Sequence, residues 1–327
     1  MRVPVPAALK RRLRPTSQWL AISLTTPQQI ADVRLVTPAG EFDVTANNAV
    51  AALRPLTIRL GLDAQLQSAV ESAPKPELHL VDRKLRRTIG VLRLKHSRDW
   101  NTAGARIGLY EVVHGRHYCA HWLRRAWDSW MYEHAVRNTP PEKLLMVPTA
   151  VEQLMVFSLC PRPVFFVSVD DGQHSNIFPM DLVGHLLPAR FTLALRNTSP
   201  SVETIKNARK VALSDAPGTA CQIAYQLGTH HKKQQIDWDT LPFKIRRSRE
   251  FSLPVPEISL RVREVEILDF QSIGSHTLFV GRICSEESLT AGAQLCHTSG
   301  IHQRLRTRHK RPFEEAFTPS ASTAQSP

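Results

Sequence analysis

The sequence predicts a mixed α+β protein with an antiparallel β-barrel in its C-terminal half. Three observations support this fold class. The C-terminal half consists mainly of short runs of β-branched and aromatic residues, separated by turn signals. These runs lack the regular strand–helix alternation of a parallel sheet. One of them also changes the phase of its alternation, as a strand does where it bends around a barrel corner.

The N-terminal half predicts a mixture of strands and helices. Apolar runs at 30–36 and 41–44 flank Thr37-Pro38-Ala39-Gly40, a turn sequence, so we expect a hairpin. Residues 89–94 alternate apolar and basic residues like a half-buried strand. Residues 118–136 show helical spacing with a mixed face, and the three tryptophans there favour packing against a neighbour. No motif in this half identifies a function.

The C-terminal half opens with a strongly β-prone hairpin. Residues 164–169 form the first predicted strand, and Asp170-Asp171-Gly172 supplies the turn. Residues 173–178 form the return strand, and residues 191–195 form another. Ser199-Pro200 then predicts a helix start, with Ser as the N-cap and Pro at the first helical position. The buried face of this helix is expected to consist of Val202, Ile205 and Ala208.

The remaining strands of this half carry the predicted bend. Residues 211–214 form one strand. Residues 258–262 alternate in one phase and residues 265–267 in the opposite phase, so one extra residue between them predicts a β-bulge. Residues 277–284 form the last clear strand.

Length and composition favour a soluble protein of two domains. The chain has 327 residues, of which 42% are hydrophobic and 22% charged, and no run approaches the roughly 18 apolar residues of a membrane span. We expect an irregular basic N-terminus (1–17), an accessory α+β region of unknown role (18–140), the barrel domain (150–312) and a disordered tail (318–327). A linker is expected at Asn138-Thr139-Pro140-Pro141, and no internal repeat is visible.

The net charge of +13 is concentrated in two basic stretches, 83–98 and 304–311. They suit either a solvated face or an anionic partner, which could be nucleic acid or a phosphorylated small molecule. The absence of interleaved aromatic residues disfavours a nucleic-acid platform. Five cysteines, an odd number without a CxxC pair, indicate reduced thiols and a cytoplasmic location. No metal-ligand spacing and no GxGxxG motif are present, and the adjacent His230 and His231 are expected to point apart.

Three segments of the C-terminal half could carry chemistry. Residues 175–181 leave the return strand of the first hairpin, where backbone N–H groups can bond a flat heteroaromatic ring. Residues 196–204 combine one arginine, several hydroxyls and a helix start, which together suit a phosphate. Residues 274–283 place a histidine at the mouth of an apolar strand interrupted by glycine. Each pattern also occurs in proteins without a ligand.

Taken in order, these segments resemble the flavin reductase-like, FMN-binding split-barrel family. Cys160-Pro-Arg-Pro-Val-Phe-Phe-Val-Ser-Val169 is similar to the first strand of the family, and residues 175–181 to the loop after its second strand. Residues 191–210 resemble the strand, phosphate loop and helix. His276-Thr-Leu-Phe-Val-Gly-Arg-Ile283 is similar to the family strand H-x-x-F-x-G-x-V, the most specific single match. The resemblance covers about half of the chain.

The resemblance implies an FMN site, usually near the interface of a homodimer, with NAD(P)H as the reductant. Carried over position by position, it implies isoalloxazine contacts from Ser175, Asn176, Ile177 and Phe178, phosphate contacts from Arg196, Ser199, Ser201 and Thr204, and His276 as the catalytic residue beside the flavin or nicotinamide. The segment Asn-Ile-Phe-Pro-Met departs from the Ser/Thr-rich run of many members, and the N-terminal half is not part of the family core.

The sequence thus predicts an FMN-dependent oxidoreductase that passes electrons to a small-molecule acceptor or a partner oxygenase. In this interpretation the protein supplies binding and electrostatics, and the flavin carries the redox chemistry. Two alternatives remain open: a non-enzymatic FMN-binding or interaction protein, and a nucleic-acid-associated protein that uses the basic stretches. The sequence leaves the acceptor and the choice between NADH and NADPH undetermined.

Overall fold

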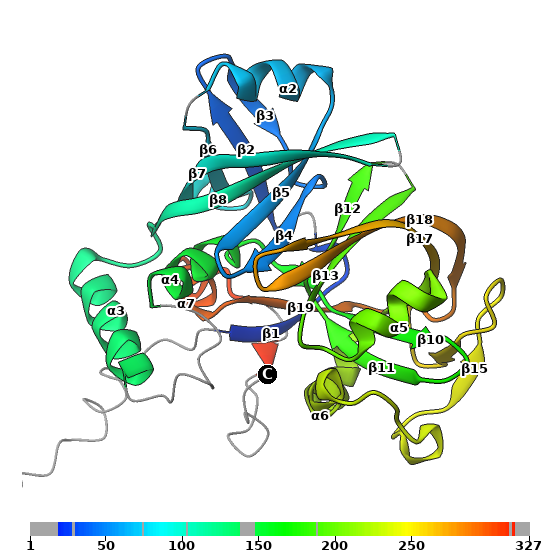
Figure 1. Ribbon diagram of the computed structural model, residues 1–327. Helices are drawn as coiled ribbons and strands as arrows, with labels where there is room; N and C mark the ends of the chain where they lie inside the picture. The colour runs from blue at the N-terminus through cyan, green and yellow to red at the C-terminus, as the bar shows by residue number, and fades with distance from the viewer. Residues whose placement is uncertain are drawn as a thin grey trace, which may run out of the picture.

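The structure is a computed structural model that describes residues 19–27, 30–73, 75–102, 104–137, 148–187, 189–313 and 316–317. It is a mixed α+β protein built on two seven-stranded antiparallel sheets, in agreement with the predicted fold class. Figure 1 shows the N-terminal sheet in blue to cyan above the C-terminal sheet in green to orange. The predicted basic N-terminus, linker and tail fall outside the described residues. No helix in the described ranges is long and apolar enough to cross a membrane.

The N-terminal sheet has the strand order β3-β2-β6-β7-β8-β5-β4. Its strands are β2 (Ala31–Thr37), β3 (Gly40–Asp43), β4 (Asn48–Leu53), β5 (Leu56–Leu62), β6 (Glu77–Asp82), β7 (Arg87–Thr102) and β8 (Ala105–His117). Helix α2 (Ala64–Glu71) connects β5 to β6. The hairpin predicted at 30–44 is confirmed by the antiparallel pairing of β2 with β3, and the strand predicted at 89–94 lies within β7.

The C-terminal sheet has the strand order β11-β10-β14-β17-β18-β13-β12. Its strands are β10 (Phe165–Asp170), β11 (Ser175–Met180), β12 (Val183–Leu187), β13 (Arg190–Arg196), β14 (Lys210–Asp215), β17 (Arg261–Ile273) and β18 (His276–Ser288). Helix α5 (Ser201–Ala208) connects β13 to β14, with Val202 and Ile205 buried as predicted and Ala208 partly buried. The predicted bulge is confirmed, because the register of β17 against β18 shifts between Glu264 and Val265.

The two sheets repeat one topology. Numbered along the chain within each half, the strands lie in the spatial order second, first, fifth, sixth, seventh, fourth, third. In both halves a helix of eight residues connects the fourth strand to the fifth. The prediction that the chain has no internal repeat is therefore wrong at the level of structure. The repeat is carried by strand pairing and burial, which similar but non-identical residues can satisfy.

Elements outside the two sheets tie the ends of the chain together. Strand β19 (Gln294–Ser299) pairs with β1 (Trp19–Leu24) and with β9 (Arg162–Pro163), and β1 also pairs with β20 (Ala316–Phe317). The other elements are α3 (Trp122–Arg137), α4 (Pro148–Phe157), η3 (Gly218–Ala220), α6 (Cys221–Leu227), η4 (Gly228–Lys232), η5 (Trp238–Thr240), β15 (Ile245–Arg247), β16 (Pro254–Pro256) and α7 (Gly300–Arg308). Helix α3 confirms the helix predicted at 118–136, but Trp122 and Trp130 are exposed on it.

Each sheet has its own hydrophobic core, and a third core joins the two. Leu35, Leu60 and Leu78 belong to the N-terminal core, whereas Phe191 and Phe279 belong to the C-terminal one. The joining core combines residues of both halves: Ala51, Ala52, Trp100, Ala105, Ile107, Leu109, Leu186, Ala194, Ile273, Leu278 and Val280. We call this contact between the halves the seam.

A buried ion pair fastens the C-terminal helix to the N-terminal sheet. The Asp82 carboxylate, at the end of β6, accepts a hydrogen bond from Arg306 (3.0 Å) and pairs with Nε2 of His302 (2.8 Å). Asp82 and His302 are fully buried, and Arg306 is 2% exposed. Burial alone would raise the pKa of Asp82, but the bonds from His302 and from the Leu85 amide, with the charges of His302 and Arg306, lower it to about 2.

Replacing Asp82 should strongly destabilise the protein. Asp82→Ala leaves the Arg306 guanidinium buried without its carboxylate, and we expect the free energy of unfolding to fall by about 3–5 kcal/mol. Asp32→Ala, which removes the pairing of an exposed Arg83, is the control and should cost at most about 1 kcal/mol. Urea unfolding of the full chain measures both, and similar losses for the two variants would contradict the assignment.

Candidate functional site

Arg196 and His276 lie side by side where two strands of the C-terminal sheet meet the start of α5. Arg196 ends β13, His276 begins β18, and the two are paired in the antiparallel register. Asn197 holds this corner together, since its Oδ1 accepts from the Thr277 hydroxyl (2.9 Å) and its Nδ2 donates to the Gly274 carbonyl (3.0 Å). Two of the residues singled out from distant parts of the sequence are therefore neighbours.

The surroundings of His276 determine its charge and its tautomer. The side chain is 2% exposed. Its Nδ1 accepts a hydrogen bond from the Ser275 hydroxyl (2.8 Å) and lies 3.4 Å from the Leu53 amide of the other half. Burial, and then the charge of Arg196, lower the pKa of His276 to about 4. The imidazole is therefore neutral near pH 7, and because Nδ1 is an acceptor the proton resides on Nε2.

Arg196 is a half-buried cation beside another cation. Burial, and then the charge of Arg54, lower the pKa of its guanidinium. Among the residues that the structure describes, no carboxylate pairs with Arg196. The charges of Arg54 and Arg196 act on each other without a described carboxylate to compensate Arg196, and so form a local positive potential that favours an anion.

The start of α5 is arranged differently from the prediction. The helix begins at Ser201, Pro200 occupies the cap position without a side-chain cap bond, and the predicted N-cap Ser199 is wrong. The Ser199 hydroxyl instead donates to the His231 carbonyl (3.0 Å). The Ser201 hydroxyl faces the Asn176 amide (3.4 Å), and Thr204 is 2% exposed. Ser199 and Ser201 are thus bonded or packed within the protein.

The four residues predicted to contact the flavin ring lie on strand β11, and their side chains have different surroundings. Asn176 is fully buried and donates to the carbonyls of His230 (2.9 Å) and Lys233 (2.8 Å), while its Oδ1 is buried without a partner. The side chains of Ile177 and Phe178 are fully buried in two hydrophobic cores, so only their backbone could contact a ligand. The Ser175 hydroxyl accepts from the indole of Trp238 (2.8 Å).

His231 contacts β11 with its side chain and Ser199 with its carbonyl, and the sequence did not identify it as a site residue. Its Nε2 donates to the Pro179 carbonyl (2.7 Å), and its ring lies 4.8 Å from that of Phe178. Burial is the main cause that lowers its pKa to about 4, and Arg196 is the largest charge acting in the same direction. The neighbouring His230 bonds the Ile177 carbonyl (2.9 Å), so both histidines reach the same strand. No local pattern shows this, because η4 reaches β11 only in the folded chain.

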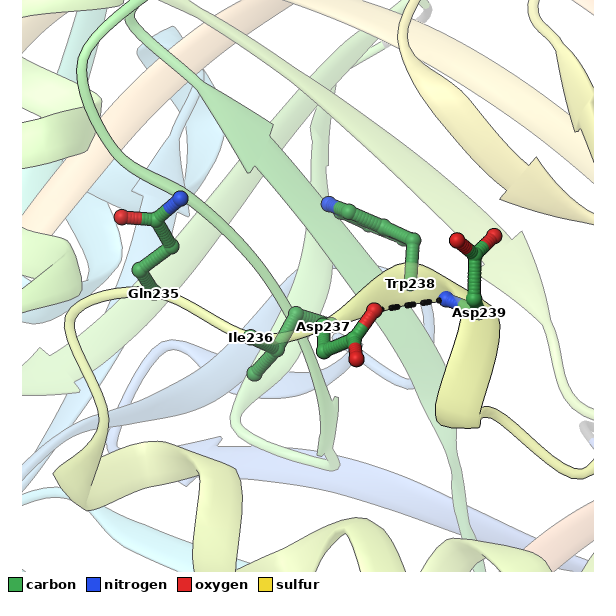
Figure 2. A pocket seen from close by; sticks show the side chains of 5 residues that line it. All are labelled: Gln235, Ile236, Asp237, Trp238 and Asp239. Carbon is green, nitrogen blue, oxygen red and sulfur yellow. Dashed lines mark hydrogen bonds between the residues drawn. The ribbon is translucent and has the colours of Figure 1, made fainter.

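Two shallow hollows share Trp238 in their lining. One of about 590 Å³ is lined by residues that include Ser175, Phe243 and Arg247. The other, of about 510 Å³, is lined by residues 235–239 (Figure 2). There the Asp237 carboxylate accepts a hydrogen bond from the Asp239 amide (3.1 Å), so it stabilises this turn. In the described part of the chain, no three His, Cys, Asp or Glu side chains gather in a way that could hold a metal ion.

Comparison with protein families identifies the domain that carries these groups. Residues 157–299 match the family model described as flavin reductase like domain. The C-terminal half of the chain is therefore a flavin reductase-like domain, as the resemblance of its motifs predicts. The match contains all nine residues that were singled out as candidate site residues. No curated protein matches the sequence of this chain.

Solved structures similar to this chain cover about half of it. An FMN-binding protein from Thermus thermophilus is 21% identical, with a TM-score of 0.38 over 49% of this chain and 90% of that one. BorF, the flavin reductase component of a bacterial two-component tryptophan halogenase, is 17% identical, with a TM-score of 0.41 over 45% and 92%. An NADH:FAD oxidoreductase from Streptomyces globisporus is 19% identical, with a TM-score of 0.42 over 55% and 100%.

The buried histidines should make the protein less stable in mild acid. His276 and His117 are 2% and 4% exposed, and burial is the main cause that lowers the pKa of each to about 4. In the unfolded chain a histidine titrates near pH 6.5, so between pH 6.5 and 4 the unfolded state binds more protons. The free energy of unfolding therefore falls as the pH is lowered through this window, by at most about 1.4 kcal/mol per pH unit for each histidine.

Unfolding of His276→Gln in urea at pH 7 and pH 5 measures the contribution of this side chain. We expect the variant to lose less stability than the wild type between the two pH values. An equal loss in wild type and His276→Gln would show that His276 is not neutral in the folded protein.

Proposed function

We propose that the protein is an FMN-binding oxidoreductase that uses NAD(P)H to reduce the flavin and delivers electrons to a separate acceptor. One observation carries the proposal: a flavin reductase-like domain places Arg196 and His276 side by side at the start of α5. Bound FMN would supply the redox chemistry, and the chain would supply binding, orientation and electrostatics. The reduced state of all five cysteines is compatible with the cytoplasm.

The residues present suit the phosphate of FMN. Arg196 offers a forked donor that no described carboxylate occupies, and Arg54 adds positive potential. The start of α5 carries no side-chain cap, so no side-chain acceptor competes with an anion for the positive end of the helix dipole. The Asn176 amide lies 3.4 Å from the Ser201 hydroxyl at the start of α5, and its Oδ1 is buried without a partner. This also indicates a polar environment that the described part of the chain does not complete.

His276 would act as a neutral donor in this site. Its Nδ1 is held by Ser275 and approached by Leu53, which orients the ring and leaves the proton on Nε2. A preorganised N–H stabilises negative charge that develops beside it, with no cost of reorientation during the reaction. This role requires that Nε2 face the flavin or the nicotinamide.

A non-enzymatic FMN-binding role is the second candidate. It is favoured by the contacts of the 230–233 segment, whose carbonyls accept the hydrogen bonds of Asn176 and Ser199. With these donors engaged, the flavin would be held mainly by its phosphate. The absorbance spectrum of the purified protein, recorded with and without NAD(P)H, separates the two: flavin colour that bleaches indicates the enzyme, and colour that persists indicates the binding protein.

Arg196→Ala should weaken the binding of FMN. The substitution removes a charge-assisted hydrogen bond to the phosphate, worth about 1.5–3 kcal/mol, and so raises the Kd roughly tenfold to hundredfold. Fluorescence titration with FMN measures the change. Arg249→Ala removes an exposed arginine of the same domain and should leave the Kd unaltered. An unchanged Kd for Arg196→Ala would place the phosphate elsewhere.

His276→Ala should slow the reduction of bound flavin by NAD(P)H, because the Nε2–H donor is lost, while His276→Asn should be milder because it keeps a donor. Stopped-flow rates on flavin-saturated protein, together with thermal melts, test this. A purely structural role for His276 would instead lower the Tm and leave the rate per flavin-loaded molecule equal to that of the wild type.

A further inference from the structure

The two halves agree in register as well as in strand order. The pairing of β4 with β5 shifts between Val50 and Ala52, and that of β12 with β13 shifts between His185 and Leu187. In these ladders Val50 pairs with Ile58, and His185 with Phe191. The same bulge therefore lies at the same place in both halves, which makes Ile58 the counterpart of Phe191.

The long hairpins give the same correspondence independently. Ile58 also pairs with Tyr110 of β8, and Phe191 pairs with Gly281 of β18. The register of β7 against β8 shifts directly beside Tyr110, and that of β17 against β18 shifts directly beside Gly281. Two unrelated sets of strand pairs thus assign the same equivalent positions.

Equivalent residues meet each other across the seam. Counting from these positions, Arg59 corresponds to Thr192 and Ala49 to Gly184. Nε of Arg59 donates to the Thr192 hydroxyl (2.9 Å), and a Cβ added to Gly184 would lie 2.7 Å from the Cβ of Ala49. Contact between equivalent positions is the signature of a two-fold, isologous interface. The seam has this form within one chain.

With this correspondence, the position of Arg196 and His276 can be compared with its equivalent in the N-terminal half. Arg196 corresponds to Asp63, and His276 corresponds to Ala105. Asp63 is an acid that caps α2 by accepting from the Leu66 amide (2.8 Å). Residues 197–200, the serine-containing loop before α5, have no counterpart, because α2 begins directly after Asp63. Of these two equivalent positions, the C-terminal one therefore suits a phosphate and the N-terminal one repels it.

The N-terminal half contacts this C-terminal position at Arg54, whose charge acts on Arg196. The turn of the β17–β18 hairpin lies against the turn between β4 and β5: the Ser275 amide donates to the Arg54 carbonyl (3.0 Å), and the Arg54 amide donates to the Ser275 hydroxyl (3.0 Å). Gly274 adopts φ +53° there, and a Cβ on it would overlap the Arg54 carbonyl oxygen. These contacts fix the backbone of Arg54 against Ser275, the residue that precedes His276.

We propose that the chain is an internal two-fold pair in which the N-terminal half takes the place of a second subunit and contributes Arg54 to a single phosphate site formed with Arg196 and His276. The choice of FMN as the phosphate-bearing ligand rests on the proposed function, whereas the composite anion site does not. The homodimer expected from the sequence would cover an apolar face of the barrel. Here β4 and β5 of the same chain cover that face, so a second copy is not required.

Titration of the full chain with FMN and with riboflavin, which lacks the phosphate, tests the contribution of Arg54. We expect Arg54→Gln to raise the Kd for FMN about tenfold, the effect of losing one charged contact, and to leave the Kd for riboflavin unaltered. Arg93→Gln, which removes an exposed arginine of the same half that pairs with Glu77, is the control and should change neither. Wild-type affinity for FMN in Arg54→Gln, alongside weakened binding in Arg196→Ala, would overturn the composite site.

Two further readouts complete the experiment. Sedimentation equilibrium at micromolar concentration should give the 36.8 kDa mass of one chain, with one FMN bound per chain. A mass of two chains, or two FMN per chain, would overturn the internal pair. If neither flavin binds, the proposed function fails, and pyrophosphate becomes the probe: loss of its binding in both Arg54→Gln and Arg196→Ala would still support the anion site, and no binding to the wild type would refute it.

Discussion

The seam between the two halves is the constraint on which the rest of the structure depends. At its centre Arg59 is fully buried, donates to the Thr192 hydroxyl and the His185 carbonyl (2.5 Å), and leaves Nη1 without a partner. Burial lowers its pKa to about 9. A buried guanidinium without a carboxylate is expensive, so it is tolerated only where the apolar packing around it is extensive. Both halves supply that packing.

Fixing the seam also fixes the candidate site. The seam is close-packed side chain against side chain, so the two sheets cannot slide past each other without opening voids or forcing overlaps. The tip of the β17–β18 hairpin is therefore held against Arg54, and its next residue, His276, faces Arg196. The residues proposed to bind a phosphate lie at the edge of the seam, which suits a site that depends on preorganised donors.

Local sequence signals predicted much of the fold. They failed where a feature depends on contacts between segments that are distant in the sequence. The Thr37–Gly40 turn, the β-prone run before Asp170 and the phase change near Val265 are each encoded within a few residues, and each was confirmed. The repeat was missed because equivalent positions share burial and not chemistry, as Arg59 and Thr192 show. Arg196 and His276 were found through the family resemblance, but Arg54 and His231 reach the site only by folding, so no sequence spacing could place them there.

The two helix starts show how equivalent positions can serve different ends. Asp63 satisfies an orphan N–H of α2 with its own carboxylate, which stabilises the helix by about 1 kcal/mol and repels any anion. At α5 the chain inserts residues 197–200 and leaves the cap position to Pro200, which has no side-chain acceptor. The stabilisation that a side-chain cap would give is thereby absent, and no side-chain acceptor occupies the positive end of the α5 dipole. The amides of Val202 and Glu203 bond the Ser199 and Pro200 carbonyls within the first turn. A helix end that is left uncapped in one copy and capped by an acid in the other is the arrangement that a single phosphate site per chain requires.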